Sequence, residues 1–247
     1  MFKPFIDLPG GFSTNDGTID FYLRIRTLVN KNKKVVDLGA GKGLWFNDKK
    51  NIKIRKSIQH LKKDVKYLYA IDIDQAVLKN KSSHKNLLMK QGIIPLKTHS
   101  IDIIICDWVF EHIENPSPFF KEVDRILKKG GTLCARTPHK FNFASIASQI
   151  TEGSPLKGWL LNKAQPKRSK YFKSFYRLNT KKKIKKIFKN YKNNIFISIP
   201  DSAYYFGSRL IFNFFKIIHF IFPKFFSGIV ICFLKKNKIK VYSINNQ

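Results

Sequence analysis

Acidic residues are scarce in this sequence of 247 residues. Asp and Glu number 16 against 47 Lys and Arg, which gives a net charge of +31 at pH 7. A surplus of this size is typical of proteins that bind nucleic acids or anionic membranes. Lys, Asn, Ile, Phe and Tyr are abundant along the whole chain, however, as an AT-rich coding sequence would produce, so most of the surplus is expected to be solvated surface. The aromatic residues are scattered and accompany no RNA-binding motif, so a nucleic-acid partner is not expected.

Cysteine is scarce as well. Cys106, Cys134 and Cys232 lie far apart in apolar runs, and no two of them have the spacing of a metal site or a redox motif. We therefore expect reduced, buried thiols in a cytoplasmic protein. Residues 1–17 carry Asp7 and two early glycines and contain no uninterrupted apolar segment, which argues against a signal peptide.

Long apolar runs are also few. The segment from Leu210 to Phe222 would be about 20 Å long as a helix, whereas a bilayer core requires about 20 residues. Asn213, Lys216 and His219 recur at every third position within it and would form a narrow polar stripe. Three alternatives stay open for this segment. It could lie in a membrane interface, where the nearby lysines would meet anionic lipid. It could instead pack against the core or a second copy of the chain, or it could span a membrane.

Short β-branched runs alternate with amphipathic segments in the first two thirds of the chain. This alternation predicts βαβ units, and hence a parallel sheet with helices on both faces. The five strand-like segments are residues 33–38, 67–72, 86–91, 100–108 and 132–138. Two more, at 194–200 and 228–236, complete an α/β, doubly wound, mostly parallel sheet of seven strands, with an apolar helix before the last strand.

The helix before the fifth strand has clear predicted ends. In NPSPFFKEVDRILKKGG we expect Ser117 to cap the N-terminus, Pro118 to lie in the first turn, and residues 128–130 to close the helix.

The whole chain, 1–247, is expected to form one domain. Residues 139–178 are expected to be loop-rich, and this segment and 203–227 are the expected insertions on the substrate or membrane side.

The few acidic residues stand at the ends of predicted strands. Asp37 ends the first strand, Asp72 the second and Asp107 the fourth. Ligands of parallel sheets bind beyond the carboxyl ends of the strands, so these carboxylates are expected to lie near a ligand. Asp74 follows two residues after Asp72 and is expected to cap the next helix.

A glycine-rich loop follows Asp37 and narrows the choice of ligand. Gly39, Gly41 and Gly43 are followed by Leu44, whereas the dinucleotide fingerprint G-x-G-x-x-G requires glycine at that last position. A pyrophosphate would also be repelled by Asp37. S-adenosylmethionine has no phosphate and carries a cationic sulfonium and an ammonium group, so it fits the acidic surroundings better, and Asp72 could accept both ribose hydroxyls.

Four segments carry a family resemblance. VVDLGAGKG (35–43), AIDIDQAVL (70–78), IPLKTHSIDIIICDWVFEHIENP (94–116) and ILKKGGTLCARTP (126–138) resemble, in order and spacing, the motifs of class I S-adenosylmethionine-dependent methyltransferases of the type-11 kind. The resemblance covers residues 34–138 and implies a Rossmann-like fold with S-adenosyl-L-methionine as cofactor. NDGTIDFY (15–22) and residues 164–180 also resemble a bacterial subgroup linked to surface-polysaccharide or lipid pathways.

The resemblance also implies which residues line the cofactor site. Many members of the family have an acid near the end of the third strand that meets the adenine amino group. Lys90 and Gln91 stand there in this sequence, and Gln91 could substitute as an amide. The implied cofactor-binding residues are Asp37, Gly39, Gly41, Gly43, Asp72, Ile73 beside the adenine, Gln91 and Asp107.

Glu111 and His112, after the fourth strand, have several possible roles. They could act as a general base pair, bind a metal, or order the loop before Pro116. Some metal-dependent methyltransferases of this fold carry a further Glu three positions before such a Glu-His pair, where Trp108 stands here, so we expect no metal.

Three further residues are candidates for the acceptor side. His139, just after the fifth strand, is expected to face the same crevice and to serve as an acid–base or substrate contact. Tyr176 and Arg177 are possible substrate-side residues. The candidate catalytic residues are therefore His112, His139 and Glu111.

The leading hypothesis is a cytoplasmic methyltransferase that could lie peripherally on the inner face of the cell membrane and act on a glycan- or lipid-linked acceptor. Methyl transfer depends mainly on proximity and orientation, and a base is needed only if the acceptor keeps its proton. The alternatives are a quinone or small-molecule methyltransferase and a catalytically silent scaffold that binds a membrane or a partner. The sequence fixes neither the acceptor nor the oligomeric state.

Overall fold

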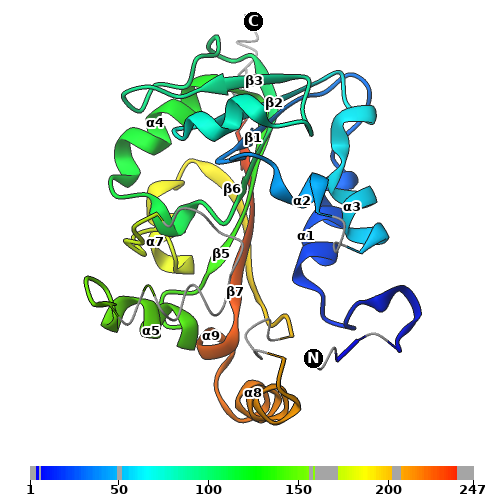
Figure 1. The fold of residues 1–247 in the computed structure, drawn as a ribbon. Coiled ribbons are helices and arrows are strands. Elements are labelled where there is room, and N and C mark those ends of the chain that lie inside the picture. The colour runs from blue at the N-terminus through cyan, green and yellow to red at the C-terminus, as the bar shows by residue number, and fades with distance from the viewer. Residues whose placement is uncertain are drawn as a thin grey trace, which may run out of the picture.

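A seven-stranded sheet forms the centre of the molecule, with strand order β3-β2-β1-β4-β5-β7-β6 (Figure 1). The computed structural model describes residues 4–5, 7–48, 52–155, 158, 172–201 and 207–237. The strands are β1 (Lys34–Leu38), β2 (Tyr67–Asp72), β3 (Lys85–Leu88), β4 (Ile101–Asp107), β5 (Leu127–Pro138), β6 (Tyr191–Ser198) and β7 (Ile229–Lys236). The first five pair in parallel, and β7 runs antiparallel to both β5 and β6. The predicted seven strands and the mostly parallel sheet are confirmed.

Helices cover both faces of the sheet (Figure 1). On one face lie α1 (Gly17–Arg26) and α3 (Lys53–Gln59), and on the other α4 (Pro116–Ile126) and α7 (Lys181–Ile187). Each face has its own apolar core: Phe21, Ile25 and Ile58 belong to the first, and Val123 and Ile184 to the second. The other α-helices within the described residues are α2 (Leu44–Asn47), α5 (Phe143–Ile150), α8 (Arg209–Ile221) and α9 (Lys224–Ser227), and 3-10 turns span Pro9–Gly11, Leu61–Lys63, Gln75–Lys79 and Phe110–His112.

The ends of α4 differ from the sequence-based expectation. Pro116 is the first helical residue after Asn115, and Pro118 lies in the first turn as predicted, but no side chain caps the helix, so the expected Ser117 cap is wrong. Proline suits this first position because its φ is already helical and its missing N–H would have no partner there. At the other end Leu127 already pairs with Ile101 in the sheet, and residues 128–131 form an irregularity at the start of β5 instead of a helix end.

The segment 139–178 contains more structure than expected, because α5 forms after Asn142, whose side chain accepts a hydrogen bond from the amide of Ala144. Residues 156–157 and 159–171 of this segment lie outside the described residues, as do residues 203–206 of the segment 203–227. Cys106, Cys134 and Cys232 are buried and form no disulfide, as predicted.

Candidate functional site at the carboxyl ends of the strands

The loop between β1 and α2 has a backbone that only glycine adopts without strain. Gly39, Gly41 and Gly43 have φ values of +81°, +49° and +65°, in the left-handed region. A Cβ on Gly39 would collide with the side chain of Val109, and one on Gly43 would lie 2.6 Å from the amide oxygen of Asn80. Gly41 is different, because the nearest atom to its Cβ would be a carboxylate oxygen of Asp72 at 3.9 Å. The loop thus leaves space for a ligand beside Gly41.

Asp72 lies at the end of β2 and is held by two backbone amides. The N–H of Gly41 donates to Oδ2 at 2.8 Å, and the N–H of Asp74 donates to Oδ1 at 2.9 Å. An ionised carboxylate has about four acceptor positions, so each oxygen keeps a lone pair for a further donor. Asp74 accepts from the amide of Ala76 at 2.8 Å and caps the following 3-10 turn, as predicted.

The carboxyl group of Asp37 lies in a negative environment. Burial, followed by the charges of Asp107 and Asp72, raises the pKa of Asp37 to about 7. Among the described residues, none donates a hydrogen bond to this carboxyl. The structure therefore brings together the three acids at or next to the ends of β1, β2 and β4, and a cationic group placed beside Asp37 would favour its ionised form.

Asp107 is engaged by partners within the protein. Its Oδ2 accepts from Nη2 of Arg136 at 2.9 Å and from the hydroxyl of Tyr22 at 3.1 Å. Arg136 is only 4% exposed, and its guanidinium also donates to Thr18 and lies over the ring of Trp108 at 5.2 Å. Direct contact between Asp107 and a cofactor stays a prediction, because this carboxylate already neutralises a buried cation.

Asn80 and Arg136 are site residues that the sequence analysis missed. The Asn80 side chain is 5% exposed and donates to the carbonyl of Gly41 at 3.0 Å, and this hydrogen bond holds the glycine loop in place. Its amide oxygen accepts from the backbone and hydroxyl of Ser82. Of these two residues, only Arg136 could have been found from the sequence. It is a charged residue within the otherwise apolar strand segment TLCARTP, and a charge in such a segment requires a buried partner.

Two predicted adenine contacts lie at the surface. Ile73 follows Asp72 directly and is 59% exposed, so its side chain is accessible to an aromatic ring. Gln91 is exposed in a tight turn, with φ of +51° followed by +76° at Gly92. The cofactor roles of both residues stay predictions.

Glu111 connects three segments of the chain. Its Oε2 accepts from the hydroxyl of Thr137 at 2.7 Å, and its backbone carbonyl accepts from the amide of Phe175 at 2.7 Å. Asn179 donates in turn to the Thr137 hydroxyl at 2.6 Å. Glu111 is 6% exposed, so this network is buried. These contacts favour the loop-ordering alternative, and a catalytic role of Glu111 stays a prediction.

His112 contacts the same segment, because its Nδ1 lies 2.9 Å from the carbonyl of Lys173. A carbonyl accepts only, so the proton belongs on Nδ1, and Nε2 carries the basic lone pair. His139 has the opposite arrangement: its Nδ1 accepts from the amide of Phe141 at 3.2 Å. Burial, followed by the charge of Lys181, lowers the pKa of His139 and keeps its ring neutral with the proton on Nε2. The hydrogen bonds therefore favour opposite tautomers, with the proton on Nε2 in His139 and on Nδ1 in His112.

The other candidates differ in accessibility. Tyr176 is 7% exposed with φ of +51°, whereas Arg177 is exposed.

In the part of the chain that the structure describes, no group of three or more His, Cys, Asp or Glu side chains is arranged to hold a metal ion.

Residues 54–135 match the family model described as a methyltransferase domain. The match begins after the glycine loop and contains Asp72, Asp107, Glu111 and His112. No functionally curated protein matches the sequence.

Solved methyltransferases share the fold at low sequence identity. One from Methanosarcina mazei is 16% identical over 87% of this chain and 98% of its own, with a TM-score of 0.53. One from Archaeoglobus fulgidus is 12% identical over 88% and 92%, with a TM-score of 0.53. A third, from Bacillus halodurans and called putative, is 14% identical over 89% and 99%, with a TM-score of 0.51. This chain therefore has the fold of S-adenosylmethionine-dependent methyltransferases, with a methyltransferase domain match at residues 54–135.

Proposed function

We propose that the protein transfers the methyl group of S-adenosylmethionine to an acceptor held beyond the carboxyl ends of β4 and β5. The observation that carries this proposal is Asp72, whose carboxylate is fixed by the amides of Gly41 and Asp74 and keeps lone pairs for a vicinal diol. The space beside Gly41 lets such a ligand approach the backbone. The bound cofactor would supply a methyl group already activated by its sulfonium.

The residues of this chain would bind and orient both reactants. Asp37 would face the cationic methionine end, because a positive charge compensates the negative potential of Asp37, Asp72 and Asp107. In the reaction the acceptor heteroatom forms a bond to the methyl carbon while the carbon–sulfur bond breaks, and the acceptor loses its proton. His112 could take that proton at Nε2, and His139 could hold the acceptor through an Nε2–H hydrogen bond.

The acceptor is proposed to be a glycan- or lipid-linked molecule met at the inner surface of the cell membrane. This proposal is supported by the apolar helix α8, which leads through α9 to the ring of His139, 5.8 Å from Phe225. A quinone is the second candidate, since it also resides in membranes. A silent scaffold is disfavoured because the glycine loop and Asp72 keep the geometry that a nucleoside requires.

Calorimetry with S-adenosylhomocysteine tests the cofactor site. Asp72→Asn should weaken binding about 10- to 100-fold, because a hydrogen bond to a charged group contributes about 1.5–3 kcal/mol. Asp74→Asn is the matched control: it makes the same change two residues away, at a side chain that caps a turn, and should leave the affinity nearly unchanged. Absence of heat with folded wild-type protein at millimolar ligand, or equal losses in both variants, would contradict the proposal.

A further inference from the structure

The helix α8 presents a row of apolar side chains to the outside of the molecule. Leu210, Phe214, Ile217 and Ile221 recur at intervals of four, three and four residues, so they share one side of the helix. With Phe220 they form what we call the docking face. The exposed fractions are 82% for Leu210, 58% for Phe214, 57% for Ile217, 91% for Phe220 and 67% for Ile221.

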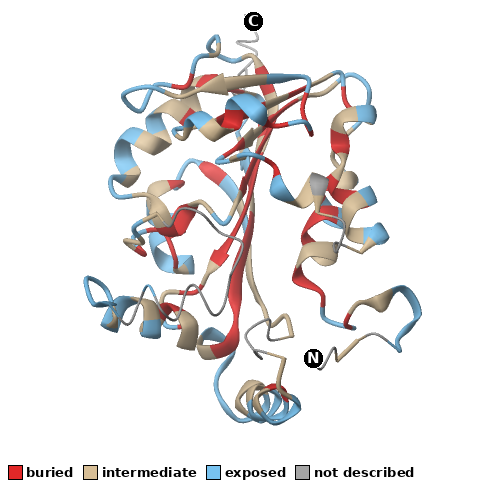
Figure 2. Ribbon diagram, viewed as in Figure 1, coloured by how far each residue is buried: buried red, intermediate tan, exposed pale blue. Residues whose placement is uncertain are grey.

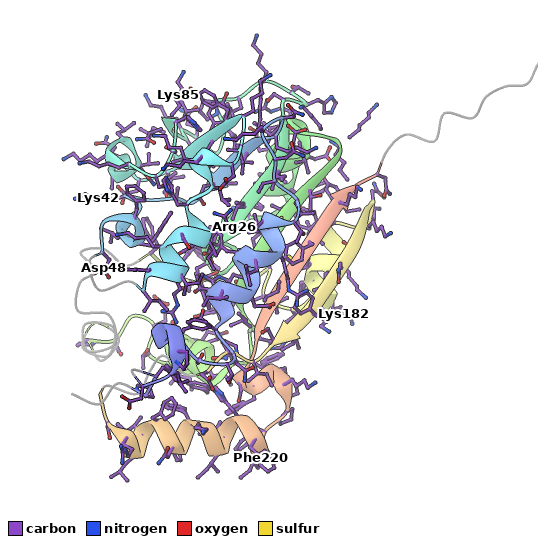
Figure 3. All side chains as sticks on the ribbon, turned by 90° about the vertical axis from the view of Figure 1, so that its right-hand side faces the viewer. Arg26, Lys42, Asp48, Lys85, Lys182 and Phe220 are labelled. Atoms are coloured by element: carbon purple, nitrogen blue, oxygen red, sulfur yellow. The ribbon has the colours of Figure 1, made fainter. Side chains whose placement is uncertain are left out.

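The opposite side of α8 is packed against the protein, which fixes the direction of the docking face. Phe212 contacts Phe5 edge-to-face at 5.6 Å between ring centroids, and Phe215 stacks on Phe143 of α5 at 4.7 Å. Figure 2 shows the side of α8 nearest the body as partly buried and its outer side as exposed. In Figure 3 α8 lies along one end of the molecule, with Phe220 on its outer side.

The expected polar stripe does not form as such. Asn213 and Lys216 are exposed beside the docking face, but the ring of His219 turns inward, with its Nε2 buried and its centroid 6.1 Å from Phe143. The helix is therefore apolar on two sides, and only one of them is used for packing within the described part of the chain.

We propose that the docking face binds the surface of an anionic lipid bilayer, with α8 lying parallel to the membrane plane. The positive charge around the docking face favours an anionic lipid surface over a second copy of this chain. Arg209, Lys216 and Lys224 flank the face, and the sequence contains no Asp or Glu after Asp201. Basic residues next to an apolar face attract anionic headgroups. A second copy of this chain would bring the same positive charges together, in a protein whose net charge is +31.

The length of α8 sets the mode of binding. Its 13 residues extend about 20 Å, shorter than the core of a bilayer. Within the described ranges, no helix is both long and apolar enough to cross a membrane. Binding in the interface plane is the arrangement that buries the docking face and keeps Lys216 and Asn213 near the headgroups.

The docking face is connected to the candidate site through α9 and Gly228. The carbonyl of Gly228, just after α9, accepts from the amide of His139 at 3.3 Å and from the side chain of Asn142 at 3.1 Å. Ile229 then pairs with Pro138 at the end of β5. Membrane binding would therefore bring the carboxyl edge of the sheet close to the lipid headgroups. If the proposed methyl transfer holds, this geometry favours an acceptor anchored in lipid with its reactive group at the surface.

Vesicle co-sedimentation tests the docking face. The protein should bind vesicles of equal parts phosphatidylglycerol and phosphatidylcholine, and much more weakly vesicles of phosphatidylcholine alone. Ile217→Glu with Phe220→Glu should lower the partition coefficient about 100-fold, because each side chain loses apolar burial and meets anionic lipid. Leu23→Glu with Ile54→Glu is the matched control, with the same charge change at exposed apolar residues of α1 and α3.

The outcomes separate this proposal from the proposed function. Circular dichroism and S-adenosylhomocysteine binding should be the same for the docking-face variant and the wild type, so a defect in vesicle binding alone supports the docking face. Loss of cofactor binding with intact vesicle binding would remove the proposed function and leave the docking face standing. The docking proposal is overturned if the folded wild type does not bind anionic vesicles, if both double variants bind equally, or if light scattering shows a dimer that the docking-face variant abolishes.

Discussion

At the scale of single residues, the candidate site is a set of carboxylates with different partners. Asp72 is held by two backbone amides, Asp107 is paired with Arg136 and Tyr22, and Asp37 has neither. Three aspartate side chains in one site therefore differ in their hydrogen-bond and ionic partners. Asp37 is the one whose charge depends on what binds beside it.

The titration of Asp37 predicts a pH-dependent stability. Its pKa in the folded protein is about 7, above its value in the unfolded chain, so the native state holds an extra proton between the two values. The free energy of unfolding then falls by about 1.4 kcal/mol per pH unit as the pH rises through that window. Asp37→Asn should therefore gain stability relative to wild type from pH 5 to 7 and level off above pH 7. Urea unfolding at several pH values measures this difference. A difference independent of pH, or one equal to that of the exposed control Asp20→Asn, would show that Asp37 ionises normally.

At the scale of elements, buried polar contacts fasten the segment after residue 171 to the sheet. Thr137 of β5 donates to Glu111, accepts from Asn179, and so links the ends of β4 and β5 to the start of α7. Two of the three predicted catalytic residues, Glu111 and His112, contribute to holding residues 173–176. The placement of residues 173–176 therefore depends on the loop that follows β4.

Thr137→Val should loosen this segment. The change keeps the shape of the side chain but leaves a buried carboxylate and a buried amide without their hydroxyl partner, which costs about 1–3 kcal/mol. The amides of Phe175 and Tyr176, which donate to the Glu111 carbonyl, should exchange hydrogen faster. Thr27→Val, which removes an exposed hydroxyl at the end of α1, serves as the control. Unchanged exchange at Phe175 would mean that the segment is held by other contacts.

At the scale of the whole molecule, one buried ion pair joins segments from distant parts of the sequence. Arg136 of β5 contacts Asp107 of β4, and through Thr18 and the shared partner Tyr22 it reaches α1. The carboxyl edge of the sheet and one covering helix are thus held together at the site itself. The network also ties α1 to the candidate site, although this helix lies outside the matched residues 54–135.

Arg136→Met should be strongly destabilising. The substitution leaves the Asp107 carboxylate partly buried without its cation, and breaking such a pair costs about 3–5 kcal/mol. Arg24→Met breaks an exposed ion pair with Asp20 and should cost about 0–1 kcal/mol. Chemical denaturation of both variants measures the contrast. Similar losses in the two would indicate that the buried network adds little to stability.

Much of the fold and part of the site follow from local sequence. The segment YLYAID predicts the strand found at Tyr67–Asp72, because its two tyrosines and Ile71 favour extended structure in a short apolar run ended by an acid. The three acids at strand ends come together because parallel strands end at a common edge. The predicted C-terminal end of α4 was wrong because sheet pairing of Leu127 outweighs the helical preference of the residues that follow.

The sequence by itself determined the seven strands, the glycine loop and the acids beside it, since each depends on neighbouring residues. Only the tertiary structure decided the partners of Asp107 and Glu111, which are contributed by residues between 26 and 85 positions away. It also decided which side of α8 faces outward. An amphipathic pattern cannot choose between two apolar sides, and the choice was made by the stacking of Phe215 on Phe143.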